Sequence, residues 1–202
     1  MVDLINIGVL ALQGSIAEHI KSLSLVEGVN PLKVKKLNDL EDISGLIIPG
    51  GESTTIGKMI KDFGLHKRII EKAEKGMPVW GTCAGMILMA KKIVDQDYIH
   101  LGIMDISVRR NAYGSQLNSF SSELTEPEVS KNPIPIVFIR APWVENVWGN
   151  VRILGRYKDR IIAVQQDNLL GTSFHPELTG DLSFHHHFVK MSKKYKETLK
   201  IK

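Results

Sequence analysis

The single cysteine of the chain stands in a five-residue pattern, Gly-Thr-Cys-Ala-Gly at residues 81–85, that could make it a nucleophile. It follows a short apolar segment and precedes a helical pattern, which predicts a sharp strand-to-helix turn. The flanking glycines let the backbone turn without a Cβ clash, and a helix N-terminus favours the thiolate form of Cys83. The alternative is a buried structural cysteine, since free cysteine is among the most buried residue types. The glycine pair in this context favours the nucleophile.

A nucleophile of this kind needs a base, and Phe-His-Pro-Glu at residues 174–177 offers one directly after another apolar segment. His175 can take the thiol proton and later return it to a leaving amine. Glu177, two residues further along an extended chain, can point the same way and hold the imidazole tautomer. The alternative is a histidine at a strand end beside a surface glutamate. His-Pro-Glu is a weak motif alone and gains weight from the cysteine turn.

Acyl transfer also needs donors for an oxyanion, and a second glycine turn, Pro-Gly-Gly-Glu-Ser at residues 49–53, could supply one. We predict the backbone N–H groups of Gly51 and Ala84 as these donors. A phosphate-binding loop is the competing interpretation, because Gly57 and Lys58 follow. The spacing between Gly51 and Gly57 is one residue too long for that motif. Met59 also stands where serine or threonine should hold magnesium. The turn is therefore predicted to serve an oxyanion.

The remaining histidines are not predicted to form a metal site. Residues 185–187 are three consecutive histidines in the last helical segment, where successive side chains point about 100° apart and cannot converge on one ion. We interpret them as partly exposed helix residues. His19, His66 and His100 show no ligand spacing either. We therefore expect neither a metal nor another cofactor.

The elements that must position these side chains alternate between strand and helix patterns. Strands are predicted at residues 5–10, 32–37, 46–48 and 78–80. Helices are predicted at residues 54–63, 65–75 and 84–92, and another starts after Ser15, which has capping-box spacing to Glu18. This alternation predicts a parallel sheet covered by helices on both faces. Such sheets bind ligands at the carboxyl ends of their strands, where the cysteine turn would lie.

The second half of the chain is richer in strand patterns. Strands are predicted within residues 100–120 and at 137–140, 151–156, 161–165 and 170–174, and a last helix at 182–199. The polar, proline-containing residues 123–135 are predicted to form a surface loop. No domain boundary or repeat interrupts the pattern, so residues 1–202 are expected to form a single domain.

The composition is that of an ordinary globular protein, with 43% hydrophobic and 24% charged residues. The net charge of +4 comes without a dense basic stripe interleaved with aromatics, which argues against nucleic-acid binding. No apolar run approaches the roughly 18 residues of a membrane span, and the N-terminus lacks a signal-peptide pattern. One cysteine cannot form an internal disulfide, so we expect a reducing, cytoplasmic location.

Several longer motifs occur together and in order. They are Leu-Ala-Leu-Gln-Gly at 10–14, Pro-Gly-Gly-Glu-Ser-Thr-Thr at 49–55, the cysteine turn, Arg110-Asn111, Phe-Ile-Arg-Ala-Pro at 138–142 and Ser-Phe-His-Pro-Glu-Leu at 173–178. With these motifs, nearly the whole chain resembles the family of glutaminase subunits of pyridoxal 5′-phosphate synthase, within the class I (triad) glutamine amidotransferases. The motifs at 49–55 and 138–142 are much more specific to this family than the cysteine turn and the His-Pro-Glu motif, which the whole class shares.

The resemblance implies a flavodoxin-like three-layer α/β/α sandwich with a mostly parallel sheet. It implies hydrolysis of L-glutamine to L-glutamate and ammonia through a Cys-His-Glu triad and a thioester. The ammonia would pass to a (β/α)₈ synthase subunit in a hetero-oligomeric complex that makes pyridoxal 5′-phosphate. It also implies a set of glutamine contacts, which fall on Gly51, Glu52, Ser53, Arg110, Ile139 and Arg140. Arg109 is the neighbouring alternative to Arg110.

Two other interpretations stay open at this level. The same scaffold could serve another substrate or acceptor, as in a γ-glutamyl hydrolase or a synthetase-linked amidotransferase. The chain could also be a non-catalytic scaffold subunit, although the intact triad opposes this. The resemblance further places Gln13 and Gly14 near the partner interface. We therefore expect a subunit that is nearly idle until docking at this segment sets the peptide between Gly50 and Gly51.

Overall fold

The computed structural model describes residues 4–110, 119–125 and 128–200, and strands alternate with helices along its first half. These elements are β1 Ile5–Leu10, α1 Ile16–Ser24, β2 Val29–Val34, the 3-10 helix η1 Leu37–Leu40, β3 Leu46–Ile48, α2 Ser53–Asp62, α3 Leu65–Glu74, β4 Val79–Thr82 and α4 Ala84–Met89. The second half contains β5 Ala90–Ile93, β6 Met104–Arg109, β7 Ser119–Leu124, β8 Ile134–Ile139, β9 Trp143–Val147, β10 Arg152–Tyr157, β11 Arg160–Gln166, β12 Leu169–Thr172, the 3-10 helix η2 Pro176–Leu178 and α5 Ser183–Lys200.

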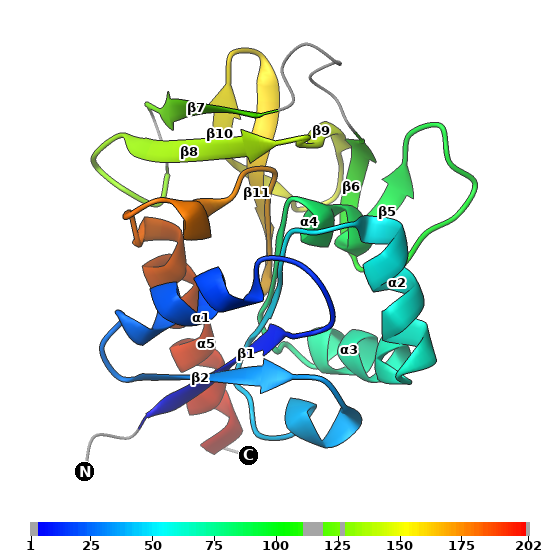
Figure 1. Cartoon of the computed structure of the whole chain (residues 1–202), viewed down its shortest axis with the longest axis vertical. Coiled ribbons are helices and arrows are strands. Elements are labelled where there is room, and N and C mark those ends of the chain that lie inside the picture. The colour runs from blue at the N-terminus through cyan, green and yellow to red at the C-terminus, as the bar shows by residue number, and fades with distance from the viewer. Residues whose placement is uncertain (1–3, 111–118, 126–127, 201–202) are drawn as a thin grey trace.

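A large sheet runs through the molecule. Within the described residues it has ten strands in the order β2-β1-β3-β4-β12-β11-β9-β6-β5, with β10 paired to β11. The five strands from β2 to β12 are parallel to one another, and β11 then runs antiparallel to β12. The strands β7 and β8 form a separate antiparallel pair. The carboxyl ends of the parallel strands therefore meet at one edge, which the β7–β8 pair overhangs (Figure 1).

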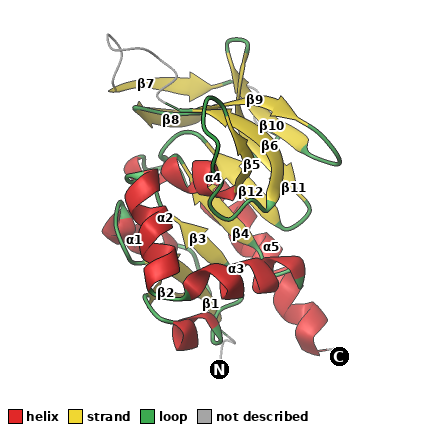
Figure 2. Ribbon diagram, turned by 90° about the vertical axis from the view of Figure 1, so that its right-hand side faces the viewer, coloured by secondary structure: helices red, strands yellow, loops and turns green. Residues whose placement is uncertain are grey.

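Helices cover both faces of this sheet, as Figures 1 and 2 show. The helices α1 and α5 pack on one face through an apolar cluster that includes Leu23, Phe184 and Phe188. The helices α2, α3 and α4 pack on the other face through a second cluster. The strand β3 contributes to both, because Ile47 belongs to the first cluster and its neighbours Leu46 and Ile48 to the second. The predicted three-layer α/β/α arrangement is confirmed.

The second strand lies earlier in the chain than predicted. β2 begins at Val29 and pairs with β1 residue by residue from Ile5 to Leu10, whereas the prediction placed it at residues 32–37. The chain leaves the sheet after Val34, because the N–H groups of Lys35 and Lys36 donate to the carboxylate of Asp39. That local turn leads into η1 and ends the strand.

The helix predicted at residues 84–92 is shorter than expected. α4 ends at Met89, and residues 90–93 form β5, which pairs in parallel with β6. Ala90 and Ile93 are buried, while Lys91 and Lys92 are exposed. The prediction was wrong here because pairing with a strand from a later segment outweighed the helical pattern of the local sequence.

The loop predicted at residues 123–135 is also shorter than expected. β7 extends to Leu124 and β8 starts at Ile134, where the two strands pair directly. Residues 126–127 of this loop lie outside the described residues, as do residues 111–118 of the strand-rich segment, including Asn111. The other strands predicted in the second half lie within about three residues of β8, β10, β11 and β12.

Candidate active site

Cys83 lies between β4 and α4 in a strained backbone conformation, with a φ of 48° and a ψ of −104°. Non-glycine residues rarely adopt a positive φ, and such strain is concentrated at functional sites. A Cβ on Gly81 would lie 2.4 Å from the carbonyl carbon of Gly85, and one on Gly85 would lie 2.0 Å from the carbonyl oxygen of Ile48. Both glycines are thus required by close backbone packing, and the predicted strand-to-helix turn is confirmed.

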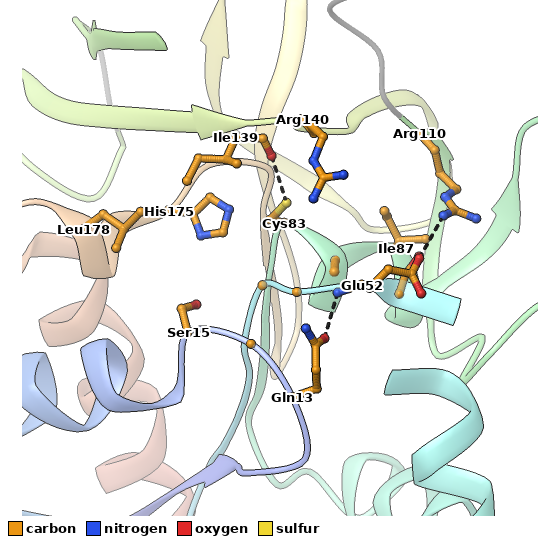
Figure 3. A pocket seen from close by; sticks show the side chains of 15 residues that line it. Gln13, Ser15, Glu52, Cys83, Ile87, Arg110, Ile139, Arg140, His175 and Leu178 are labelled. Carbon is orange, nitrogen blue, oxygen red and sulfur yellow. Dashed lines mark hydrogen bonds and ion pairs between the residues drawn. The ribbon is translucent and has the colours of Figure 1, made fainter. Parts of the chain in front are cut away.

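A cavity of about 410 Å³ opens in front of this cysteine (Figure 3). Its walls combine the segments that follow β1, β3, β4, β6 and β12 with the end of β8. Of the residues predicted for the site, the walls include Gly51, Glu52, Ser53, Cys83, Ala84, Arg110, Ile139, Arg140 and His175. The fold therefore brings together at one sheet edge nearly all of the candidate side chains, which are spread over more than half of the sequence.

His175 and Glu177 form a buried pair behind Cys83. The backbone N–H of His175 donates to the carbonyl of Val137 at 2.8 Å, which attaches the histidine to β8. Its Nδ1 lies 2.8 Å from Oε1 of Glu177. Glu177 was predicted to lie in extended chain, but Pro176 instead starts the single turn of η2, which contains Glu177. The turn still points the carboxylate at the imidazole, so the predicted contact is present by a different local geometry.

The charges of this pair follow from its surroundings. Burial by itself would lower the pKa of His175, but hydrogen bonds to Cys83 and Glu177 outweigh burial and raise the pKa to about 10. Burial would raise the pKa of Glu177, but the nearby His19 and His175 and the Ser15 hydroxyl lower it to about 2. An imidazolium paired with an ionised carboxylate favours a thiolate at Cys83.

Ser15 contacts the triad and does not cap α1. Its hydroxyl donates to Oε1 of Glu177 at 2.5 Å, and α1 has no side-chain cap at its N-terminus. The predicted capping box with Glu18 is therefore wrong. The spacing of the two residues suits a capping box, in which the serine oxygen would accept a backbone N–H of the helix. Here the serine side chain is turned toward the buried carboxylate, to which its hydroxyl donates.

The loop that carries the predicted oxyanion donor packs tightly against the triad. A Cβ on Gly50 would lie 2.3 Å from Cε1 of His175, so only glycine fits there. The N–H of Gly50 donates to Oγ1 of Thr82 at 3.0 Å, and its carbonyl accepts from the N–H of Ser15 at 3.0 Å. Oε1 of Gln13 accepts from the N–H of Glu52 at 2.8 Å. The segment at residues 13–15 thus holds the loop in place.

The two adjacent arginines at the end of β6 have different neighbours. Arg110 lines the cavity and forms an ion pair with Glu52 at 3.3 Å (Figure 3). Arg109 pairs with Glu145 and Asp95, each at 3.1 Å, and does not line the cavity. Arg109 is the last residue of β6, whereas Arg110 lies in the bend that follows it. Of the two arginines, Arg110 is therefore the one that lines the cavity.

The end of β8 presents backbone to the cavity. The carbonyl oxygen of Ile139 lies 3.8 Å from Sγ of Cys83. Arg140 follows with a positive φ of 44°, which turns the chain directly after that carbonyl. Its side chain also reaches the cavity wall (Figure 3). This segment offers one acceptor and one cation close to the nucleophile.

Several buried polar residues behind the triad were missed by sequence reasoning. His185 was predicted to be partly exposed, but it is fully buried, whereas His186 is exposed and His187 is half-buried. His19, also fully buried, contacts His185, Thr82 and Glu177. No cluster of three or more His, Cys, Asp or Glu residues that could hold a metal occurs within residues 4–110, 119–125 and 128–200.

The fold and this arrangement define an α/β protein of the class that carries a cysteine at a strand-to-helix turn beside a histidine–carboxylate pair. A family model described as the SNO glutamine amidotransferase family matches residues 9–194. The chain belongs to this family. In the parts of the chain that the structure describes, no helix is long and apolar enough to cross a membrane.

Individual relatives agree with this family. The chain is 60% identical over 187 residues to pyridoxal 5′-phosphate synthase subunit PdxT of Thermoanaerobacter sp. (strain X514), which covers 93% of this chain and 99% of the relative. It is 54% identical over 186 residues to the protein of the same name from Clostridium botulinum (strain Loch Maree / Type A3), covering 92% and 96%. A solved structure described as a glutamine amidotransferase matches with a TM-score of 0.87 and 40% identity, covering 93% of this chain and 98% of that one.

Proposed function

We propose that this chain is the glutaminase subunit of a pyridoxal 5′-phosphate synthase, with residues 1–202 as one glutamine amidotransferase domain. The proposal is supported by the family and by the close relatives that carry this name. The observation that carries the chemistry is the convergence of Cys83, His175 and Glu177 beside a cavity of about 410 Å³. Such a cavity has room for an amino acid.

The reaction begins with the thiolate of Cys83 attacking the side-chain amide carbon of L-glutamine. The N–H groups of Gly51 and Ala84 stabilise the oxyanion of the tetrahedral intermediate. His175 gives its proton to the amide nitrogen, the C–N bond breaks, and ammonia leaves a thioester on Cys83. His175 then takes a proton from water, whose oxygen attacks the thioester. The C–S bond breaks and releases L-glutamate, while Glu177 stabilises the imidazolium throughout.

The cavity walls match the charges of an amino acid. Arg110 and Arg140 supply cations for the α-carboxylate, while Glu52 and the carbonyl of Ile139 supply acceptors for the α-ammonium group. Ser53, which starts α2 beside the oxyanion loop, adds a further polar contact. These groups hold the substrate so that its side-chain amide reaches the cysteine.

The partner is the synthase subunit that consumes the ammonia, for which we propose a (β/α)₈ barrel in a hetero-oligomeric complex. The curated relatives are named as subunits of such a synthase. The reaction also requires a reduced thiol, which fits the reducing conditions of the cytoplasm.

Substitution of the nucleophile tests this function. Cys83→Ala should lower glutamine hydrolysis, measured with the synthase subunit present, by at least about 10³-fold, because no other thiol can form the thioester. Circular dichroism and thermal unfolding should show a retained fold. Glutaminase activity that survives in the folded variant would refute the assignment.

Two other functions predict different results for the wild-type protein. Wild-type protein that cleaves γ-glutamyl peptides in preference to free glutamine would indicate a hydrolase of another substrate. A wild-type chain that neither hydrolyses glutamine nor reacts at Cys83 with a glutamine-like alkylating agent would indicate a scaffold subunit.

A further inference from the structure

A second pair of buried histidines lies behind the triad, on the side away from the cavity. His19 comes from α1 and His185 from α5, and both side chains are fully buried. Nδ1 of His19 lies 3.3 Å from Nε2 of His185, and the rings of His185 and Trp80 pack in a T-shaped arrangement with centroids 5.0 Å apart. Neither histidine lines the cavity in front of Cys83. They therefore cannot contact a substrate, and their reason for being buried lies elsewhere.

The contact that matters is with the carboxylate of Glu177. Its Oε1 already accepts from Ser15 and faces Nδ1 of His175. Its Oε2 is buried and has no hydrogen bond of good geometry within the described residues. Nε2 of His19 lies 3.4 Å from this oxygen. A buried carboxylate oxygen without a hydrogen-bond donor destabilises the fold. A proton on this nearby ring nitrogen, directed at the oxygen, is therefore electrostatically favoured.

The neighbours select one tautomer of His19. If Nδ1 carried the proton, the lone pair of Nε2 would face the carboxylate of Glu177, which is repulsive. If Nε2 carries the proton, it can donate to Glu177, and Nδ1 accepts from Nε2–H of His185. His185 is then left with a bare lone pair at Nδ1, the atom for which no hydrogen-bond partner is found among the described residues. Burial lowers the pKa of both histidines, which favours their neutral forms.

The same nitrogen also reaches the oxyanion loop. Nε2 of His19 lies 3.2 Å from Oγ1 of Thr82. That oxygen accepts the N–H of Gly50 at 3.0 Å, and Gly50 precedes the predicted oxyanion donor Gly51. One imidazole thus contacts both the residue that orients the base and the residue that anchors the oxyanion loop.

We propose that His19 is a positioning residue of the glutaminase site, sharing its single Nε2–H between Glu177 and Thr82 while His185 fixes its tautomer. The inference rests on the proposed function, because it concerns the rate of that reaction. The contacts of His19 itself involve only groups that do not touch the substrate. His19 acts through Glu177 and Gly50, so it is expected to affect the rate of the chemical step and not the binding of glutamine.

The charged and titratable groups that face His19 and Glu177 come from four segments. They are Glu18 on α1, His175 after β12, Glu177 on η2, and His185 with His186 on α5. Removing the His19 donor leaves Oε2 of Glu177 without its nearest nitrogen, which raises the pKa of this carboxyl. Active enzyme needs the ionised carboxylate, so activity should then be lost at a higher pH as the solution is acidified.

The experiment compares His19→Leu, which removes both nitrogens, with His19→Gln, whose amide can reach Glu177. With the synthase subunit present, His19→Leu should lower kcat for glutamine by on the order of ten- to hundredfold, with KM within about twofold of the wild-type value. The acid limb of its pH profile should move to higher pH. His19→Gln should recover most of kcat and the original limb. Unchanged kcat and an unchanged limb in His19→Leu would overturn the proposal.

His187→Leu is the matched control. This residue is on α5, the helix that carries His185, is half-buried and contacts Gln165 at 2.8 Å, away from the triad. It should lose some thermal stability and keep the wild-type kcat and pH profile. If His19→Leu fails to fold, His185→Phe replaces it, because phenylalanine preserves the ring against Trp80. A several-fold loss of kcat at constant KM is expected there, and wild-type kcat would contradict the proposal.

A second measurement separates this proposal from the proposed function. The rate at which iodoacetamide alkylates Cys83 reports its thiolate and does not require glutamine, and Cys83 is the only cysteine of the chain. Below neutral pH this rate should fall in His19→Leu and return in His19→Gln. A wild-type chain inert toward glutamine would refute the function, while equal alkylation rates in all variants would refute the role of His19.

Discussion

At the scale of single residues, the carboxylate of Glu177 is ionised although it is buried. Burial opposes its ionisation, but His19, His175 and Ser15 outweigh burial and bring its pKa from 4.5 to about 2. A lowered folded-state pKa contributes stability that is present above the unfolded value and lost as pH falls toward the folded value. The stabilising effect of this carboxylate should therefore disappear between pH 4.5 and about 2.

Glu177→Gln tests this link between charge and stability. The free energy of unfolding of the variant should lie below that of the wild type above pH 4.5, and the gap should narrow as pH falls toward 2. Urea unfolding at a series of pH values measures the gap. A gap that stays constant with pH would show that the ionised carboxylate is not held as described.

The neighbouring arginines provide a second test at this scale. Arg110→Gln should raise KM for glutamine by roughly tenfold or more, because a charge-assisted contact to the substrate carboxylate is worth about 1.5–3 kcal/mol. Arg109→Gln removes an equal charge one residue away, where it pairs with Glu145 and Asp95 outside the cavity, and should leave KM unchanged. Equal effects of the two variants in steady-state kinetics would mean that net charge, not position, controls binding.

At the scale of elements, the turn between β4 and α4 depends on backbone packing against β3. A Cβ on Gly85 would lie 2.0 Å from the carbonyl oxygen of Ile48, which is rigid backbone inside the sheet. Gly85→Ala should therefore destabilise the fold by about 3 kcal/mol or more, since overpacking a rigid site costs 1–3 kcal/mol and occasionally more.

The matched control is Gly180→Ala. A Cβ at that position meets nothing within 4 Å, so its free energy of unfolding should stay close to that of the wild type. Urea unfolding of both variants measures the difference. Similar stabilities for the two proteins would contradict the close approach of α4 to β3.

At the scale of the whole molecule, the oxyanion loop is held by a segment that lies at the surface. Gly14 is exposed, and a Cβ on it would lie only 1.8 Å from the carbonyl oxygen of Gly50. The Ser15 N–H and the Gln13 side chain bind the same loop. A partner that presses on Gln13 and Gly14 would therefore act directly on the peptide between Gly50 and Gly51.

We expect the isolated chain to hydrolyse glutamine slowly and the synthase subunit to accelerate it. One correctly placed oxyanion donor is worth about 2.7–4 kcal/mol, which corresponds to roughly a hundred- to thousandfold in rate. Measuring ammonia release before and after mixing tests this. Full activity in the isolated chain, with no increase on mixing, would show that the loop needs no partner.

The sequence by itself determined the features that depend on neighbouring residues. The glycines around Cys83, the strand patterns that precede both glycine turns, and the helix patterns of residues 54–75 all follow from local backbone requirements and periodicity. Because strands of a parallel sheet end at one edge, the motifs could also be expected to converge there. Cys83, His175 and the predicted substrate residues do converge at that edge.

Tertiary structure alone decided which polar groups meet behind that edge. Ser15 and Glu177 are 162 positions apart, and His19 and His185 are 166 apart. Local periodicity carries no information on such pairs, so Ser15 was assigned to a helix cap and His185 to a partly exposed surface. β5 became a strand for the same reason, since its partner β6 begins at Met104. In each case a contact with another segment of the chain satisfied a buried polar group or an unpaired strand. That contact was more favourable than the local alternative.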